Sequence, residues 1–262
     1  MSSTTEPLVP FHVVDGREEG VTVLLTGSLG STVEMWQPQV EALGAHARVV
    51  RFDHRGHGAS PVPPGPYTVD DLGQDVLALL DHLGVERAHY VGLSLGAMVG
   101  MWLAARASER IDRLALLCCG PYLPPVAGWF ERAAAVRAGG IAAVADPVFA
   151  RWFTADFAGA EPYRRMLLAT PVEGYAGCCE AIGAMDLRPL LGQIHAATLV
   201  IAGAADPAAP PEMGAHIAAT VRSGRLVVVP GAAHLANVEQ PGIVNQHLVE
   251  HLFSEGGGVS VP

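Results

Sequence analysis

The sequence predicts an α/β fold with a mostly parallel central sheet flanked by helices. Short apolar runs alternate with Gly-rich turns and helical stretches along the chain, which is the order that a parallel sheet requires. These runs are apolar almost throughout, as is typical of strands buried on both faces. The predicted strands are residues 21–25, 49–52, 89–93, 114–117, 198–202 and 226–229.

The clearest predicted helix begins after Thr68. Thr68 and Asp71 have the spacing of a capping box, in which each side chain accepts a hydrogen bond from the backbone N–H of the other residue. Apolar residues then recur at helical spacing from Val69 to Leu83, and Gly84 is the type of residue that commonly follows a helix. We therefore expect a helix between Thr68 and Gly84.

Residues 121–191 interrupt this alternation of strands and helices. They show no strand pattern, but they hold helical patches and several Trp and Tyr side chains. We predict that they form a helical cap over the working edge of the sheet, inserted between core residues 1–120 and 192–255. Ordinary outer helices are the alternative. Residues 256–262 are predicted to form a Gly-rich tail or linker.

Length, composition and charge exclude several classes of protein. The chain has 262 residues, 50% of them hydrophobic and 16% charged, so we expect one globular core with or without an insertion. The 16 basic residues against 26 acidic ones give a net charge of −10, which disfavours binding to nucleic-acid phosphates. All 16 are Arg, so a catalytic or phosphate-binding Lys is excluded.

Three features indicate a cytoplasmic location. The first ten residues have no basic start and no long apolar run, so we expect no secretory signal. No stretch reaches the roughly 18 apolar residues that a membrane span needs. The 4 cysteines form two vicinal pairs without metal-binding or redox spacing, which is typical of free thiols in a reducing compartment. These pairs are Cys118 with Cys119 and Cys178 with Cys179.

The strongest chemical signal is G-L-S-L-G at residues 92–96. It joins a predicted strand to a predicted helix, the setting in which G-x-S-x-G presents a nucleophilic serine. Glycine is needed on both sides because the turn is too tight for larger side chains. We predict that Ser94 has a strained backbone with an exposed hydroxyl, and that the N–H of Leu95 faces a developing oxyanion. A Gly-rich strand end with an idle serine is the alternative.

A serine nucleophile needs a histidine base and an acid, which in this kind of turn follow in the order acid, then histidine. His54 and His57 precede Ser94, and we interpret them as surface residues of an Arg- and Gly-rich turn. His234 comes just after the last predicted strand, at the carboxyl end where α/β sheets place their sites. It is the predicted base. Less well placed are His195, His216, His247 and His251.

Asp206 is the predicted acid. It lies in the turn G-A-A-D-P at residues 203–207, directly after the predicted strand 198–202. An Asp before Pro is also a common turn residue, which is the alternative interpretation. Asp112 and Asp186 are less well placed.

A second oxyanion donor is expected in the loop T-G-S-L-G-S at residues 26–31. Its glycines allow the backbone to approach a ligand closely. We favour the N–H of Ser28, with Leu29 as the second choice and a plain Gly-rich turn as the alternative. Residues 53–58, D-H-R-G-H-G, are predicted to fix a turn and not to contact substrate.

Four stretches together resemble the 3-oxoadipate enol-lactonase family of the α/β-hydrolase superfamily, which acts in bacterial degradation of aromatic compounds through the β-ketoadipate pathway. The sequence departs from this family at three places. Ala97 stands where a second Gly is expected, Gly27 stands before Ser28 where the family often has Asn, and C-C-G-P-Y-L-P-P follows Leu117 where the family usually has Asn-Thr-Ala. The stretches are G-S-L-G-S-T-V-E-M-W-Q-P-Q at 27–39, D-H-R-G-H-G-A-S-P-V-P-P-G-P-Y-T at 53–68 with D-D-L-G-Q-D-V at 70–76, R-W-F-T at 151–154 with E-G-Y-A-G-C-C at 173–179, and A-A-H-L-A-N-V-E-Q-P at 232–241.

This resemblance implies an α/β-hydrolase fold with a helical cap and a triad of Ser94, Asp206 and His234, with Leu95 and Ser28 as backbone oxyanion donors. It also implies opening of the ring of 3-oxoadipate enol-lactone to 3-oxoadipate, without a metal or organic cofactor. In some bacteria such a lactonase is fused to a carboxymuconolactone decarboxylase, and the tail is a candidate linker. The sequence leaves the oligomeric state open.

An anionic lactone would be repelled by the negative net charge, so a local cation must hold it. Without Lys, that cation must be an Arg of residues 121–191. Arg132 with Trp129, one helical turn away, is the first choice, and Arg151 with Trp152 is the second. Solvated surface arginines are the alternative. The other candidates are Arg137, Arg164 and Arg165.

Two other functions fit the sequence. A carboxylesterase or a cofactor-free haloperoxidase or perhydrolase would keep the triad without an anion site. A hydrolase scaffold reused as a ligand receptor is less favoured, because all three triad positions are occupied by suitable residues.

Overall fold

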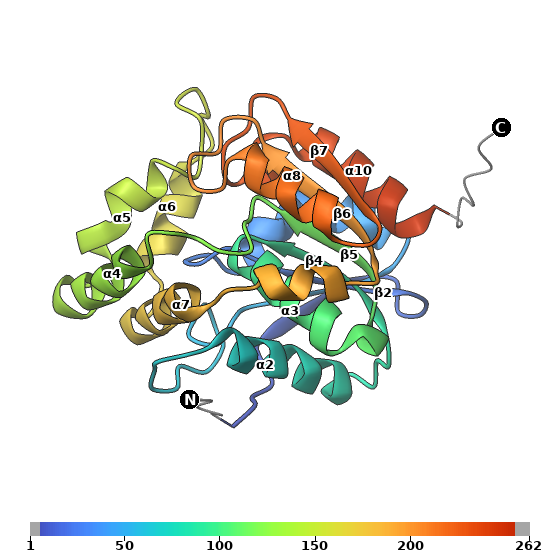
Figure 1. Cartoon of the computed structure of the whole chain (residues 1–262), viewed down its shortest axis with the longest axis horizontal. Coiled ribbons are helices and arrows are strands. Elements are labelled where there is room, and N and C mark those ends of the chain that lie inside the picture. The colour runs from blue at the N-terminus through green and yellow to red at the C-terminus, as the bar shows by residue number, and fades with distance from the viewer. Residues whose placement is uncertain (1–5, 255–262) are drawn as a thin grey trace.

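A central sheet organises the chain in the computed structural model, which describes residues 6–254 (Figure 1). Its seven strands lie in the order β1-β3-β2-β4-β5-β6-β7. All neighbouring strands are parallel except β1, which pairs with β3 in the antiparallel direction. The strands are β1 His12–Gly16, β2 Thr22–Thr26, β3 Arg48–Phe52, β4 Ala88–Leu93, β5 Ile111–Leu117, β6 Ala197–Gly203 and β7 Gly224–Val229.

The predicted α/β class is confirmed, and the six predicted strands correspond to β2–β7 with small shifts at their ends. Strand β1 was not predicted. It is a half-exposed edge strand of sequence H-V-V-D-G, so it lacks the continuous apolar run that revealed the others. Strand β7 is the other edge. Three of its six residues are exposed and only Val229 is buried, contrary to the expectation of burial on both faces.

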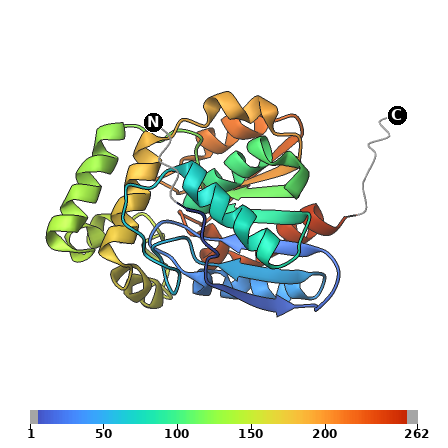
Figure 2. The ribbon, with the colours of Figure 1, turned by 90° about the horizontal axis from the view of Figure 1, so that it is seen from below.

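Helices cover both faces of the sheet (Figure 2). On one face α1 and α10 pack against each other, and on the other α3 packs on β4 and β5 while α8 packs on β6 and β7. Helix α2 has the predicted capping box of Thr68 and Asp71, and Gly84 follows it with a φ of 65°. These helices are α1 Gln37–Gly44, α2 Val69–His82, α3 Leu95–Arg106, α8 Pro211–Thr220, α9 Ala236–Glu239 and α10 Pro241–Phe253.

Four helices lie between β5 and β6, to one side of the sheet in Figure 1, and we call them the cap helices. Helices α4 and α7 pack against each other, and a 3-10 helix, Arg188–Gln193, leads back to β6. No strand occurs in residues 121–191. The predicted tail, residues 256–262, lies outside the described residues. The cap helices are α4 Val126–Gly139, α5 Ala142–Phe149, α6 Glu161–Leu168 and α7 Val172–Ala184.

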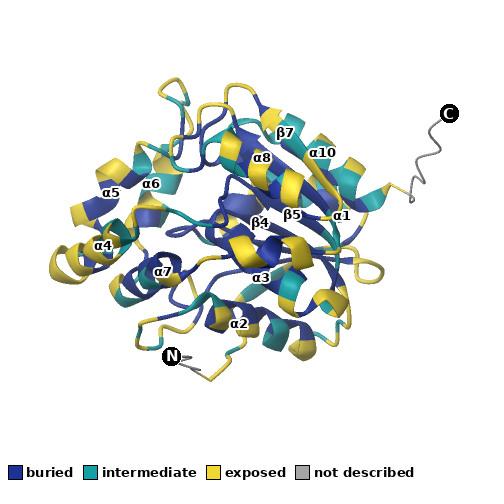
Figure 3. Ribbon diagram, viewed as in Figure 1, coloured by how far each residue is buried: buried dark blue, intermediate teal, exposed yellow. Residues whose placement is uncertain are grey.

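The core is formed by the middle strands and by α3 (Figure 3). All six residues of β4 are buried, as are ten consecutive residues of α3 from Leu95 to Ala104. The turn between these two elements is therefore held from both sides. Among the described residues no helix is long and apolar enough to cross a membrane.

Candidate active site

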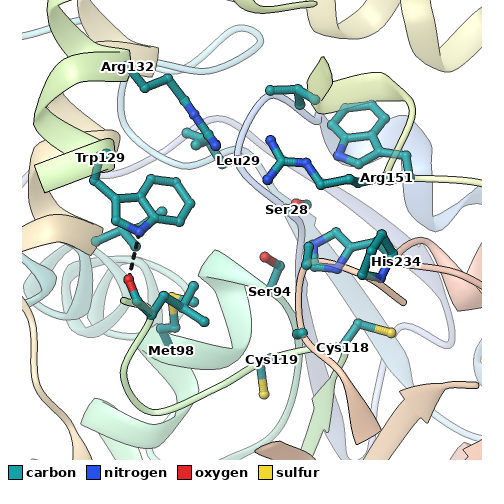
Figure 4. A pocket seen from close by; sticks show the side chains of 18 of the residues that line it. Ser28, Leu29, Ser94, Met98, Cys118, Cys119, Trp129, Arg132, Arg151 and His234 are labelled. Carbon is teal, nitrogen blue, oxygen red and sulfur yellow. Dashed lines mark hydrogen bonds between the residues drawn. The ribbon is translucent and has the colours of Figure 1, made fainter. Parts of the chain in front are cut away.

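Ser94 occupies the turn between β4 and α3 and has a φ of 54°, which few residues other than glycine adopt. The two flanking glycines have no room for a side chain. A Cβ on Gly92 would overlap the backbone of Gly96, and a Cβ on Gly96 would overlap the carbonyl oxygen of Thr26. The tight turn therefore explains G-x-S-x-G in physical terms, and it directs the Ser94 hydroxyl into a cavity (Figure 4).

Asp206 and His234 come from the loops after β6 and β7, and both are buried. The Oδ2 atom of Asp206 lies 2.8 Å from Nδ1 of His234. Because a carboxylate accepts hydrogen bonds, the imidazole donates from Nδ1 and keeps a lone pair on Nε2. The other oxygen of Asp206 accepts from the N–H groups of Ala208 at 2.8 Å and Ala209 at 3.1 Å. The carboxylate is thus held in place on both sides.

The loop after β7, which carries His234 and which we call the histidine loop, faces Ser94. His234 and Ser94 line the same cavity, and Figure 4 shows the imidazole next to the Ser94 hydroxyl. A backbone hydrogen bond of 2.9 Å from Ala205 to Ala232 joins the aspartate loop to the histidine loop. The structure therefore gathers the three predicted residues at the carboxyl edge of the parallel strands.

Two backbone segments meet beside Ser94. Leu95 is the first residue of α3, so its N–H has no partner within the helix and lies at the positive end of the helix dipole. Ser28 lines the cavity from the opposite loop. Its carbonyl accepts from the Ser31 N–H at 3.1 Å and the Ser31 hydroxyl at 2.7 Å. Gly96 N–H donates to Gly27 O at 3.0 Å, which ties this loop to α3.

The interpretation of His54 and His57 as surface residues is wrong, because both are buried beneath this loop. Gly30 N–H donates to Nε2 of His57 at 2.9 Å, so the ring proton is on Nδ1, which lies 3.2 Å from Arg55 O. Burial lowers the pKa of His57 to about 4 and that of His54 to about 3. Two neutral imidazoles therefore support the loop that carries Ser28, and the polar turn sequence alone does not reveal this.

The cavity at the serine has a volume of about 320 Å³ and a wall of both polar and apolar side chains. All four predicted substrate-binding residues line it, namely Trp129, Arg132, Arg151 and Trp152. The guanidinium of Arg132 lies 4.5 Å from the centre of the Trp129 ring, and the indole N–H donates to Leu123 O at 2.9 Å (Figure 4). Arg151 donates from Nε to Pro147 O at 3.0 Å.

Arg132, in α4, and Arg151, between α5 and α6, differ from the arginines of the cap helices that form ion pairs. Arg137, Arg164 and Arg165 form ion pairs with carboxylates. Within residues 6–254, Arg132 and Arg151 have no such pair. The pKa of Arg151 is lowered by burial and by the neighbouring charge of Arg132. Two cations thus share a cavity of a negatively charged protein without a carboxylate in direct contact within residues 6–254.

Cys118 and Cys119 also line this cavity. Burial raises the pKa of Cys118 to about 12 and raises that of Cys119 further. Because only a thiolate is strongly nucleophilic, these buried thiols do not compete with Ser94. In the described part of the chain, no group of three or more His, Cys, Asp or Glu side chains is arranged to hold a metal ion.

A strand–turn–helix serine, a carboxylate–imidazole pair on later loops and a parallel sheet define the α/β-hydrolase class. A sequence profile of the alpha/beta hydrolase fold matches residues 21–241, so the chain belongs to this family. The expectation that it is a hydrolytic enzyme is confirmed.

Comparison with named proteins and solved structures shows which α/β hydrolases this chain resembles. The chain is 38% identical over 252 residues to 3-oxoadipate enol-lactonase 2 of Acinetobacter baylyi, covering 94% of each chain. A crystal structure of the enol-lactonase from Burkholderia xenovorans superposes with a TM-score of 0.89 at 41% identity, covering 92% of this chain and 95% of that one. A hydrolase from Pseudomonas aeruginosa gives a TM-score of 0.89 at 44% identity, covering 92% and 93%. The predicted resemblance to enol-lactonases is confirmed.

Proposed function

We propose that the chain is a serine hydrolase that opens the ring of 3-oxoadipate enol-lactone to give 3-oxoadipate, in the bacterial degradation of aromatic compounds. The similarity to named enol-lactonases supports this substrate. A cavity of about 320 Å³ suits a small lactone, and the apolar part of its wall suits the ring.

The observation that carries the proposal is that Arg132 and Arg151, in the cavity that contains Ser94, have no carboxylate partner within the described residues. Two guanidinium groups that form no ion pair within residues 6–254 favour an anionic ligand, because a carboxylate supplies a direct counter-charge. The enol-lactone bears one carboxylate. We assign its binding to these two arginines, with Trp129 and Trp152 against the ring.

The first chemical step is acylation of Ser94. Nε2 of His234 takes the hydroxyl proton while Oγ attacks the lactone carbonyl carbon, and Asp206 stabilises the imidazolium. The oxyanion lies between the N–H groups of Leu95 and Ser28. When the carbonyl re-forms, the ring C–O bond breaks and the leaving enolate takes the proton from His234. The enol becomes the ketone.

The second step is hydrolysis of the acyl-enzyme. His234 removes a proton from water as the water oxygen attacks the ester carbonyl. Collapse of this second tetrahedral intermediate returns the proton to Ser94 Oγ and releases the new carboxylate. No electron transfer takes place, so the residues described suffice for both steps.

The test of this function is the ultraviolet absorbance of freshly generated 3-oxoadipate enol-lactone with the purified protein. We expect rapid loss of the lactone and formation of 3-oxoadipate. If the lactone survives while p-nitrophenyl acetate is cleaved, the activity is that of a carboxylesterase or a haloperoxidase or perhydrolase of the same fold. If the protein binds the lactone without cleaving either compound, it is a receptor.

We further propose a cytoplasmic location, supported by the free thiols of all four cysteines. The proposed partner is the small anionic lactone, with no nucleic acid and no membrane. Association or fusion with a carboxymuconolactone decarboxylase is a further proposal, tested by co-purification of the two activities.

A further inference from the structure

Glu239, at the end of α9, accepts three hydrogen bonds with its carboxylate. Oε2 accepts from the Ala233 N–H at 2.6 Å. Oε1 accepts from both the N–H of Thr154 at 2.8 Å and its hydroxyl at 2.7 Å. In residues 6–254 this carboxylate has no ion-pair partner, so these donors are what balance its charge. Glu239 belongs to A-A-H-L-A-N-V-E-Q-P, and the chemistry of Ser94 and His234 does not use it.

Glu239 joins the segment that carries the base, His234, to the segment that carries the proposed substrate-binding residue Arg151. Ala233 immediately precedes His234. Thr154 belongs to R-W-F-T, the segment that carries Arg151 and Trp152. A further hydrogen bond of 2.9 Å runs from the N–H of Leu235, on the other side of His234, to Trp152 O. The base is thus attached on both sides to the segment that presents Arg151.

We propose that Glu239 is a positioning residue that couples recognition of the substrate carboxylate by Arg151 to the placement of His234. This inference rests on the proposed function, since it assumes an anionic substrate. Charge-assisted hydrogen bonds to one carboxylate fix the distance between the two segments more firmly than neutral contacts would. A carboxylate bound at Arg151 therefore finds the base already aligned with the carbonyl to be attacked.

The proposal predicts a change in selectivity. The matched substrates are mono-p-nitrophenyl adipate and p-nitrophenyl hexanoate, which have acyl chains of equal length and differ in the terminal carboxylate. In Glu239→Gln the amide N–H₂ cannot accept from a backbone N–H, so one of the two segments is released. We expect the preference in kcat/KM for the charged ester to fall about tenfold, since small displacements cost such factors.

Three further comparisons make the test more specific. Glu173 also joins a cap helix to the core, through the N–H of Gly65 at 3.0 Å, but it contacts neither His234 nor Arg151. Glu173→Gln should therefore leave the preference unchanged. In Arg151→Gln the charged-ester preference is already reduced, so adding Glu239→Gln should lower it no further. Thr154→Val, which removes only the hydroxyl contact, should cause a smaller fall in the same direction.

The possible outcomes separate the proposal from the function on which it rests. A native enzyme without preference for the charged ester would overturn both. A native preference that Glu239→Gln retains, even with a lower melting temperature, would overturn only the role of Glu239. A loss that is unchanged in the Arg151→Gln background would also overturn it, because the effect would not pass through Arg151.

Discussion

Gln39 and Asn237 hold each other by two hydrogen bonds, one from Asn237 Nδ2 to Gln39 Oε1 and one from Gln39 Nε2 to Asn237 O, each 3.0 Å long. Both side chains are fully buried. Gln39 lies in α1, beyond the loop of Ser28, and Asn237 lies three residues after His234. The pair therefore connects α1, which follows the loop of Ser28, to α9, which follows His234, through the interior.

Asn237→Leu should destabilise the fold by about 2–4 kcal/mol, because it leaves Gln39 Oε1 and Met35 O buried without the donor that both share. Urea unfolding measures this directly. Gln240→Leu is the matched control, since its amide contacts Gly231 O at the surface and its loss should cost less than about 1 kcal/mol. Equal losses for the two variants would contradict the account.

Asp206→Asn should lower kcat on the order of 10⁴-fold while leaving the fold intact. The amide no longer fixes the proton on Nδ1 of His234, so Nε2 loses its function as a base. Steady-state kinetics with p-nitrophenyl acetate measure the loss. Asp186→Asn is the control, because that exposed carboxylate pairs with Arg188 and does not line the cavity, so it should not affect kcat. A small effect at Asp206 would reject it as the orienting acid.

Arg132→Gln and Arg151→Gln should each raise KM for the enol-lactone by about 10–100-fold, the range for loss of a charged hydrogen bond. Cleavage of neutral p-nitrophenyl acetate should change by less than about threefold, since it has no carboxylate to lose contact with. Arg165→Gln serves as the control because its ion pair with Glu161 is exposed. Equal effects on the charged and neutral substrates would contradict anion recognition.

His57 should make stability depend on pH. Its pKa is lowered by burial to about 4 from an ordinary value of 6.5, so between these values the unfolded chain binds more protons than the folded one. This contribution to stability is complete above pH 6.5 and is lost as the pH falls towards 4. Between pH 7 and pH 5, the free energy of unfolding should fall by about 2 kcal/mol more in the native protein than in His57→Gln.

Urea titrations at the two pH values test this difference. His195 is exposed on the segment before β6, so His195→Gln should keep the native pH dependence. An unchanged pH dependence in His57→Gln would show that its imidazole does not titrate differently in the two states.

The part of the fold that sequence predicted best is the part with the strongest local constraints. Apolar runs of the inner strands and the glycines beside Ser94 leave few conformations open. Strand β1 was missed because an edge strand needs no continuous apolar pattern. The positions of Asp206 and His234 followed from a general property of parallel sheets, whose strands end at one edge.

The residues that hold the loops of the site in place could not be predicted from local sequence patterns. His57 and Glu239 act through contacts between segments that are far apart in the chain, and a polar residue looks the same in sequence whether it is solvated or buried. The hydrogen bond from Gly30 to His57 and those from Thr154 to Glu239 are visible only in three dimensions. The unpaired state of Arg132 and Arg151 likewise depends on which carboxylates the cap helices bring near the other arginines.

The central claim is that Ser94 is the nucleophile, and a fluorophosphonate tests it most directly, because attack by the serine oxygen expels fluoride and leaves a stable adduct. Trypsin releases residues 88–106 as one peptide in which Ser94 is the only serine. Mass spectrometry should find one adduct per chain on this peptide, with loss of enol-lactone hydrolysis in proportion, and none in Ser94→Ala. An adduct on the peptide 18–48, which carries Ser28, or full labelling of Ser94 with activity retained, would contradict the account.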